Sequence, residues 1–557
     1  MAMDRRAFLK GSAAVAGGVA AVGAMGATAF ADETEAPSWG TVEVDEDVIA
    51  AVDAEKSDEP PAWLGTPPDI SVDDCVETVE TDVVVVGSAL AGVLSAYSAI
   101  QNGAQVVMIE RNGAPHISGS GIGFFNSEYQ KAGGQPEHNE QIIMNKVINE
   151  GNLRVDAALV AMWAYHSGEI LDELEENVLQ PAGLPGTISI GEPLDEEELD
   201  QYEEAFHVDF DDTGNDSLEK FDYIFHDWIR EHGGTIAFNT CARVLTQDED
   251  GTVTGLIATN ENGEYVYYKA NKAVIMCAGS YGGNEEMVDA LCYPSMAQFI
   301  KKYSGYNAKA SETAPITTGE KMDDGIGHRM MCWAGAIMEE IDPSYQAWSN
   351  TGYWIAAPLA VNNKGERFFN EAISSLSSSF AIFELPDGAN YVWQIMGSDD
   401  FDFPALLPMP GANREMMEAM AAGSEMYEAD TIEELAGLIG VPADTLVATV
   451  ERYNELCALG KDEDYGKGAN HLHPIDTPPF KAYKEAYYFF GMSSGVKVNK
   501  NLQVVDANWD PIPHLYAAGN CVGWRMGSGY QNVIPGLCNA YAAVHGYYAG
   551  KNAAAEA

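Results

Sequence analysis

The residues with the clearest chemical spacing are a glycine-rich turn and an acidic side chain downstream of it. In TDVVVVGSALAGVLSAYSAIQNGAQVVMIERN, Gly87 follows one apolar run and Glu110 follows the next. Gly92 permits close packing of the helix expected between the two runs, and Ala89 replaces the middle glycine of the dinucleotide fingerprint. Such a helix N-terminus binds a pyrophosphate, while the acid binds a ribose. A tight turn without nucleotide is the alternative.

Strand-like runs surround this pattern. Val83 to Val86 is β-branched, as in a buried parallel strand. Residues 233–287 alternate like a β-meander with Asp-Gly and Asn-Gly turns, then give a buried strand, 273–277, and a glycine-rich turn, 278–284. Near the C-terminus, NLQVVDANWDPIPHLYAAGN predicts a last strand that ends at Gly519 and Asn520. A final helix is expected from about Pro535 onward.

Composition limits the classes of partner. The 557 residues are too many for one simple core, and the formal net charge of -55 disfavours nucleic acid and anionic lipid. The acidic surface acts either as a solubility coat or as a docking surface for a cationic protein. None of the 8 cysteines forms Cys-x-x-Cys, so any haem would belong to another chain. The pair His471 and His473 has no further ligand nearby, and no metal site is expected.

The N-terminus has the pattern of an export signal. Arg5 and Arg6 precede a weakly apolar stretch that ends in the cleavage pattern Ala29-Phe30-Ala31. Residues 1–31 therefore predict a twin-arginine signal peptide, with an ordinary secretory signal as the alternative, and residues 32–77 form an acidic linker. Since this pathway carries folded cargo, the protein is expected to take up a cofactor first. It is expected to work outside the cytoplasm, in the periplasm, at the cell surface or as a secreted protein.

Several motifs give the chain a family resemblance. CAGSYGGNEEM, DDGIGHRMMCWAGA, NNKGERFFNE, TVERYNELCALGKDEDYGKG and HLYAAGNCVG occur in this order. Together they resemble the fumarate reductase and 3-ketosteroid dehydrogenase superfamily of flavoproteins. The resemblance implies noncovalent FAD in an α/β, glutathione-reductase-like Rossmann-type domain. This domain would comprise residues 78–337 and 491–557, with an inserted α+β capping domain at 338–490.

The resemblance also suggests which residues hold the cofactor. The predicted FAD-binding residues are Gly87, Ser88, Ala89, Ala91, Gly92, Glu110, Arg111, Ser118, Gly119, Ser120, Gly121, Val244, Ala278, Gly279, Asn284, Asp324, Gly519, Asn520, Gly536 and Leu537. The N-terminus of the final helix is expected to point at the flavin N1–C2 carbonyl edge, where its partial positive charge favours the reduced anion.

Members of this superfamily move a hydride between flavin N5 and a carbon beside, or conjugated to, a carbonyl. Fumarate reductases place an arginine where this chain has Ser375, and another arginine and a histidine where it has Tyr530 and Met526. A desolvated dianion needs such donors, so fumarate is not the expected substrate. Arg525, next to the aligned histidine position, leaves recognition of a single carboxylate open; an outward salt bridge is the other interpretation.

The motif Met526-Gly527-Ser528-Gly529-Tyr530 is similar to the MGxxY motif of ketosteroid dehydrogenases. Their tyrosine polarises a keto oxygen, so Tyr530 is expected to face a carbonyl; packing on the flavin edge is the alternative. Those enzymes place a tyrosine base where this chain has Ser375, which is a poor proton carrier alone. Unranked candidates for the proton donor are Tyr281, His328, Tyr303 and Tyr306, although His328 is expected to be structural.

Together these features predict an exported FAD reductase of the C=C bond of an enone or enoate, with an apolar or aromatic substrate. Its electron donor would be external, either a c-type cytochrome or a membrane quinol-linked protein. A ketosteroid-type dehydrogenase, a carboxylate reductase that uses Arg525, and an electron-transfer flavoprotein without its own small substrate remain alternatives.

Overall fold

The computed structural model describes residues 60–114, 121–188, 207–209, 217–303, 323–339, 345–349, 359–372, 385, 389–403, 414–415, 418, 425–527, 534 and 536–556. The chain divides into two compact units, residues 1–62 and 63–557. All strands and α-helices described below belong to the second unit. Within the described ranges, no helix combines the length and apolarity needed to cross a bilayer.

The largest sheet of the described residues has eight strands in the order β15-β16-β9-β1-β2-β6, with β7 and β8 joined through β9. Strands β16, β9, β1, β2 and β6 are parallel. Residues 83–86 are all buried, as expected for a strand covered on both faces. The strands are β1 (Glu77–Val86), β2 (Val106–Ile109), β6 (Thr235–Ala237), β7 (Cys241–Gln247), β8 (Val253–Thr259), β9 (Tyr265–Met276), β15 (Gln503–Val505) and β16 (Pro511–Ala517).

The strand order reverses at β1, which has β2 on one side and β9 on the other. Their carboxyl ends are level, because Val86 pairs with both Ile109 and Met276. Met276 in turn pairs with Ala517 of β16. Ligands of open α/β sheets bind at the carboxyl ends of strands, where the order reverses. The loops that follow these four strands therefore meet at the edge where a ligand is expected.

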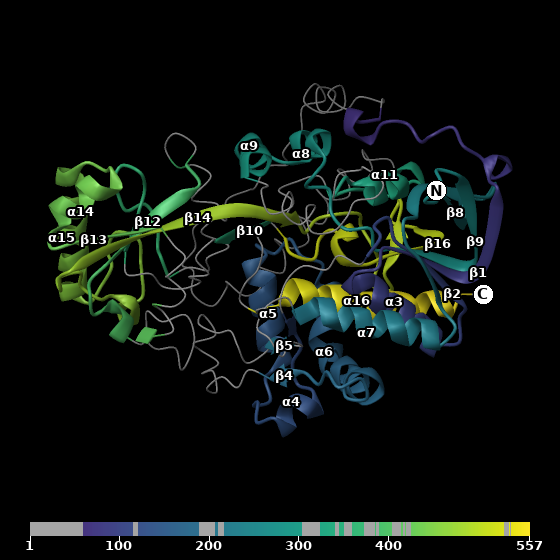
Figure 1. The fold of residues 1–557 in the computed structure, drawn as a ribbon, viewed down its shortest axis with the longest axis horizontal. Helices are drawn as coiled ribbons and strands as arrows, with labels where there is room; N and C mark the ends of the chain where they lie inside the picture. The colour runs from purple at the N-terminus through teal and green to yellow at the C-terminus, as the bar shows by residue number, and fades with distance from the viewer. Residues whose placement is uncertain are drawn as a thin grey trace, which may run out of the picture. The chain divides into compact units, whose positions relative to one another are not determined.

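Helices from both ends of the chain cover this sheet. The helix α3 (Leu90–Gln101) packs closely on α16 (Leu537–Ala554), and α7 (Ser217–Glu231) also contacts α3 (Figure 1). Glycines permit the approach, since a Cβ on Gly546 would lie 2.4 Å from the carbonyl oxygen of Ala91. The helix nearest the start of the described chain is thus held by the helix at its end.

A second sheet has five described strands and its own core. The strand β14 (Phe480–Met492) pairs antiparallel with β10 (Tyr345–Ser349), β12 (Tyr391–Met396) and β13 (Met426–Ala429), and β11 (Leu359–Val361) pairs with β12. The helices α14 (Ile432–Ile439) and α15 (Ala443–Leu459) supply Leu435, Leu446 and Tyr453 to this core. The predicted domain boundary after residue 490 falls inside β14, and the domain limits stay predictions.

The remaining described elements lie between the parts of the large sheet in sequence. A small antiparallel sheet pairs β5 (His207–Asp209) with β3 (Ile122–Gly123) and β4 (Thr187–Ile188). A π-helical turn, Glu175–Leu179, directly continues α6. The helices are α4 (Glu128–Ala132), α5 (Glu140–Glu150), α6 (Ala157–Leu174), α8 (Glu285–Leu291), α9 (Pro294–Tyr303) and α11 (Ile326–Trp333).

Candidate active site

The turn after β1 has the backbone of a phosphate-binding turn. Gly87 has φ 101°, and a Cβ there would lie 2.2 Å from the carbonyl oxygen of Cys277. A Cβ on Gly92 would lie 1.9 Å from the Gly87 carbonyl oxygen. Ala89 is the N-cap of α3 and provides no side-chain acceptor. The first N–H groups of α3 therefore lack a side-chain cap, which suits an anion.

Glu110 lies directly after β2 and is buried. Its Oε2 accepts hydrogen bonds of 3.1 Å from both the backbone N–H and the hydroxyl of Ser88. Its Oε1 accepts a 2.9 Å bond from the N–H of Asn112. Each carboxylate oxygen has two lone pairs, so the group keeps acceptor capacity for ribose hydroxyls. The structure thus brings the predicted ribose-binding acid against the glycine-rich turn.

Two buried residues of α7, His226 and Asp222, were not predicted. Nε2 of His226 and Oδ2 of Asp222 lie 3.7 Å apart, and His226 supports the same turn. The Nε2 of His226 lies 3.0 Å from the carbonyl oxygen of Ser88, and therefore donates to it. Burial lowers the pKa of His226 to about 4 and, with Glu110 nearby, raises the pKa of Asp222 well above its ordinary value. The ring of His226 is thus uncharged near neutral pH. A polar pair at i and i+4 on the buried face of a helix is the signal that could have found them.

Several of the predicted cofactor-binding residues contact one another at the start of α11. Arg111, directly after Glu110, forms a 2.9 Å ion pair with Asp324. Asn284 donates from Nδ2 to the carbonyl oxygen of Asp324 at 2.9 Å. The N–H of Ser280, just beyond Ala278 and Gly279, donates to Asp323 at 3.0 Å. Three sequence-distant segments therefore converge, whereas Val244 lies in β7 beside a register shift.

The C-terminal half of the site begins after β16. Gly519 has φ 66°, and a Cβ there would lie 2.9 Å from the Cβ of Ala91 in α3. The carbonyl oxygen of Asn520 is 3.2 Å from Nε2 of His328. Burial lowers the pKa of His328 to about 4, so this ring is neutral and donates to the backbone. The turn after β16 therefore lies close to α3 and is bonded to α11.

The start of α16 is the second helix N-terminus at this site. Its N-cap, Gly536, has φ 71° and provides no side-chain cap, and Leu537 is fully buried. Asn539 in the first turn donates from Nδ2 to the carbonyl oxygen of Gly121 at 2.9 Å. Gly121 is thus fixed next to this helix end.

Five predicted residues lie outside the described part of the chain: Ser118, Gly119, Ser120, Ser375 and Tyr530. Tyr306 does so as well. Of the other candidate proton donors, Tyr281 is fully buried, and its hydroxyl oxygen lies 2.7 Å from the Ser494 hydroxyl oxygen. Burial raises the pKa of Tyr281 well above its ordinary value. Tyr281 and His328 therefore have structural partners, and Tyr303 ends α9 as a half-buried residue.

Arg525 is fully buried, although the sequence suggested either a substrate anchor or an outward salt bridge. Its Nε donates to the carbonyl oxygen of Val522 at 3.0 Å, and Nη2 donates to Oδ1 of Asn520. Its Nη1 contacts Sγ of Cys538 at 3.8 Å. The outward salt bridge is therefore wrong, because a side chain without exposed surface does not reach solvent. Met526 beside it is also fully buried.

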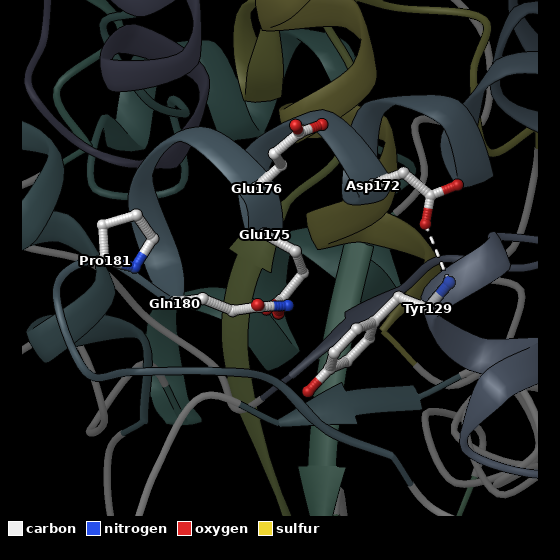
Figure 2. A pocket seen from close by; sticks show the side chains of 6 residues that line it. All are labelled: Tyr129, Asp172, Glu175, Glu176, Gln180 and Pro181. Carbon is white, nitrogen blue, oxygen red and sulfur yellow. Dashed lines mark hydrogen bonds between the residues drawn. The ribbon is translucent and has the colours of Figure 1, made fainter.

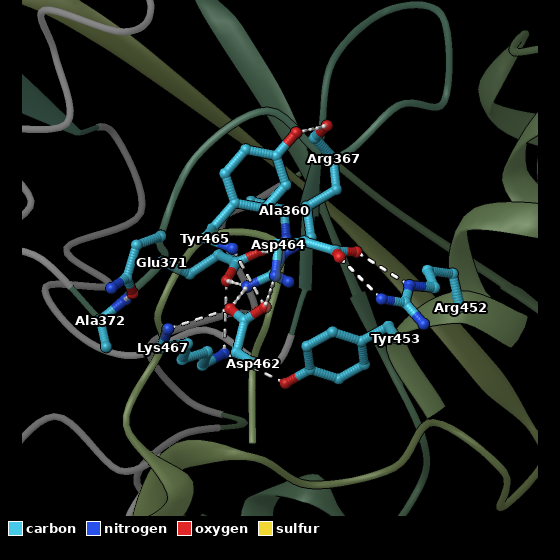
Figure 3. A network of polar contacts seen from close by, with 11 residues as sticks. Ala360, Arg367, Glu371, Ala372, Arg452, Tyr453, Asp462, Asp464, Tyr465 and Lys467 are labelled. Atoms are coloured by element: carbon cyan, nitrogen blue, oxygen red, sulfur yellow. Dashed lines mark hydrogen bonds and ion pairs between the residues drawn. The ribbon is translucent and has the colours of Figure 1, made fainter. Parts of the chain in front are cut away.

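A buried ion network holds the segment that leads to Ser375 (Figure 3). Arg367 bonds both oxygens of Glu371 at 2.8 Å and Asp462 at 2.7 Å. Lys467 lies 3.5 Å from Glu371 and donates to the hydroxyl of Tyr453 at 3.1 Å. The network fixes the described chain as far as Glu371, four residues before Ser375.

A pocket of about 370 Å³ lies elsewhere, against α6 and the π-helical turn (Figure 2). Its Asp172 accepts 2.9 Å bonds from the N–H groups of Glu128 and Tyr129 at the start of α4. Its Glu175 accepts a 2.7 Å bond from the N–H of Gly186. None of the predicted cofactor-binding residues lines it, and Asp172 and Glu175 hold neighbouring backbone.

Comparison with known proteins places these features in a family. The family described as "FAD binding domain" matches residues 82–533. The chain is 26% identical over 505 residues to the vinyl phenol reductase of Lactiplantibacillus plantarum, covering 85% of this chain and 96% of that protein. It is 28% identical over 507 residues to the urocanate reductase of Eggerthella lenta, covering 86% and 75%.

The fold is also similar to that of a solved structure. The 3-ketosteroid-Δ4-(5α)-dehydrogenase from Rhodococcus jostii RHA1, in complex with 4-androstene-3,17-dione, superposes with a TM-score of 0.67 at 20% sequence identity. The likeness covers 88% of this chain and 100% of that one. The predicted α/β fold class is therefore confirmed.

The residues at the sheet edge fit the cofactor of such a fold. Two helix N-termini lack side-chain caps, and Gly87 and Gly92 leave no room for a Cβ. The buried acid after β2 completes the set that a dinucleotide requires. The expected cofactor, FAD, is confirmed by the family and agrees with these residues.

Proposed function

The chain belongs to the FAD binding domain family, and on this basis we propose that it reduces the C=C bond of an enone or enoate whose body is apolar or aromatic. It is an FAD-dependent oxidoreductase of the group that acts on C=C bonds. When bound, the flavin supplies a hydride from N5 to one carbon of that bond. The residues of the chain orient the substrate and stabilise the charge that develops.

The lack of cationic groups at the substrate-anchor positions supports this substrate class. A desolvated dicarboxylate needs fixed positive donors. By alignment with fumarate reductases those positions are Ser375, Met526 and Tyr530, and none is cationic. The neighbouring Arg525 has its donors directed at Asn520, Val522 and Cys538. This arrangement favours a substrate without two carboxylates.

In this proposal Tyr530 binds the carbonyl oxygen of the substrate. A phenol is uncharged at neutral pH and donates one hydrogen bond, which strengthens as the oxygen gains enolate charge. Loss of one such donor costs roughly 100- to 1000-fold in kcat. Tyr530→Phe should therefore lose turnover by about this factor while keeping its bound flavin. Tyr165→Phe, at an exposed tyrosine of α6, is the matched control.

The activity test is anaerobic reoxidation of the dye-reduced holoprotein. Enones, cinnamate-like acids and fumarate are added separately, and the return of the oxidised flavin spectrum is followed. Rapid reoxidation by neutral enones and aromatic acids supports the proposal, and brisk reoxidation by fumarate contradicts it. An electron-transfer protein would respond to none of these compounds. An unchanged rate in Tyr530→Phe would remove Tyr530 from the reaction.

We also propose that the protein is exported and receives electrons from an external donor, either a c-type cytochrome or a membrane quinol-linked protein. Arg5, Arg6 and the pattern Ala29-Phe30-Ala31 support export through the twin-arginine route. The measurement is the N-terminal sequence of the protein recovered from fractionated cells. A mature chain that begins at Asp32, outside the cytoplasm, is expected. An uncleaved chain found only in the cytoplasm contradicts this proposal.

A further inference from the structure

Arg525 is a buried charge whose observed partners are all neutral. Its side chain has no exposed surface. The acceptors are the carbonyl oxygen of Val522, the amide oxygen of Asn520 and the sulfur of Cys538. A guanidinium group remains positive and has five N–H donors. Such an ion loses several kcal/mol of hydration on burial, which neutral acceptors offset only in part.

No acidic side chain of the described residues forms an ion pair with Arg525. Burial raises the pKa of Glu339 to about 7, although the positive charge of Arg525 acts in the opposite direction and lowers it. The charges of Arg154 and Lys497 also act on Glu339, and Lys497 pairs with Asp156 at 2.6 Å. Among the described residues, Arg525 therefore has no acid of its own as an ion-pair partner.

The position of this charge is informative. Asn520 belongs to the turn after β16, and Cys538 belongs to the first turn of α16. Arg525 therefore bridges two segments that carry predicted cofactor-binding residues, beside a helix N-terminus with its own partial positive charge. Burial lowers the pKa of His328 to about 4 and of His545 to about 3, and the Arg525 charge contributes in both cases. The rings around Arg525 thus stay neutral and supply no counter-charge.

We propose that Arg525 balances the negative charge that two-electron reduction leaves on the bound flavin, and that it raises the reduction potential instead of binding a substrate carboxylate. Reduction by two electrons with uptake of one proton leaves the flavin with one negative charge. Arg525 contributes electrostatically, and no covalent bond to it forms or breaks. This inference depends on FAD being the cofactor and is independent of the proposed substrate.

The test is the midpoint potential of the holoprotein, measured anaerobically against reference dyes without substrate. Arg525→Met removes the charge and keeps an unbranched side chain, whereas Arg525→Lys keeps the charge. We expect Arg525→Met to shift the equilibrium at least tenfold against the reduced flavin, about 30 mV for a two-electron couple. Arg525→Lys should stay much closer to the wild type. Arg329→Met is the control, because Arg329 bonds the carbonyl oxygen of Leu64 instead.

Each other outcome has a defined meaning. An unchanged potential, with a KM that rises only for carboxylate substrates, would make Arg525 a substrate anchor and overturn the inference. An unchanged potential with lower thermal stability would make it purely structural and also overturn it. If Arg525→Met does not retain flavin, the test becomes the absorbance spectrum of the fully reduced wild type at mildly acidic pH, which reports whether N1 of the flavin is protonated. A flavin deprotonated at N1 supports the inference, and a neutral reduced flavin overturns it.

Discussion

Replacing Arg367 with methionine should destabilise the protein far more than the loss of an exposed arginine pair. The side chains of Arg367, Glu371 and Asp462 are only 6%, 1% and 0% exposed. The variant leaves two buried carboxylates with one ammonium group, that of Lys467. Removal of one partner from a buried ion pair costs about 3–5 kcal/mol. We expect a loss of this size in the free energy of unfolding.

Arg452→Met provides the matched control. Arg452 also bonds both oxygens of an aspartate, Asp464, at 3.0 and 2.8 Å. This pair is 46% and 31% exposed, so its loss should cost about 0–1 kcal/mol. The assay is urea unfolding of the holoproteins, followed by circular dichroism and by tryptophan fluorescence. Equal losses in the two variants would refute the reasoning.

The pH dependence gives a second check on Arg367→Met. Burial alone would raise the pKa of Asp462, but hydrogen bonds from Arg367 and from the N–H groups of Lys467 and Tyr465 hold it far below its usual value. A carboxyl group whose pKa is lowered by folding stabilises the folded state at every pH above the pKa of the unfolded chain, about 3.9. This contribution is lost as the pH falls from about 3.9 towards the lower pKa of the folded state. The stability gap between the variant and the wild type should therefore narrow below about pH 4.

Two further predictions concern the cofactor cradle, by which we mean the turns after β1 and β16, the first turn of α16, and His328, which bonds the turn after β16. Gly87→Ala should lose most of its bound flavin, because the new Cβ would lie 2.2 Å from the Cys277 carbonyl oxygen; Gly103→Ala, also at positive φ but in open space, should keep its flavin when absorbance is measured. Because burial lowers the pKa of His328 to about 4, the unfolded chain binds the extra proton below about pH 6.5. The melting temperature should thus decline from about pH 6.5 to 4, and less steeply in His328→Gln.

Some predicted site residues lie where the structure has an unusual backbone, although their role in binding the cofactor stays a prediction. Gly87 and Gly519 were recognisable because positive φ and close approach restrict the residue type. Glu110 was recognisable because its distance from the turn is set by one strand–helix–strand unit. These constraints act within short segments, so the local pattern was sufficient to predict them.

Other parts depend on contacts between distant segments. Arg367 and Asp462 are joined only by the fold, and no local pattern pairs them. Asp222 and His226 looked like ordinary polar residues of a helix, and their burial depends on α3 packing beside α7. Arg525 was expected to contact either solvent or a substrate carboxylate, because charged side chains are seldom fully buried, but its side chain has no exposed surface.

The meeting of β1, α3 and α16 also sets the order in which the molecule can be assembled during synthesis. The strand that begins the cradle, β1, leaves the ribosome before the helix that completes it, α16, which lies about 450 residues later in the chain. Closing so long a loop adds little equilibrium cost, because that cost grows only logarithmically with length. Pairing such distant segments is nevertheless slow. A chain truncated before Leu537 would keep the sequence of the second sheet but lack α16 and its N-terminus, so stable cofactor capture has to wait until α16 has been made.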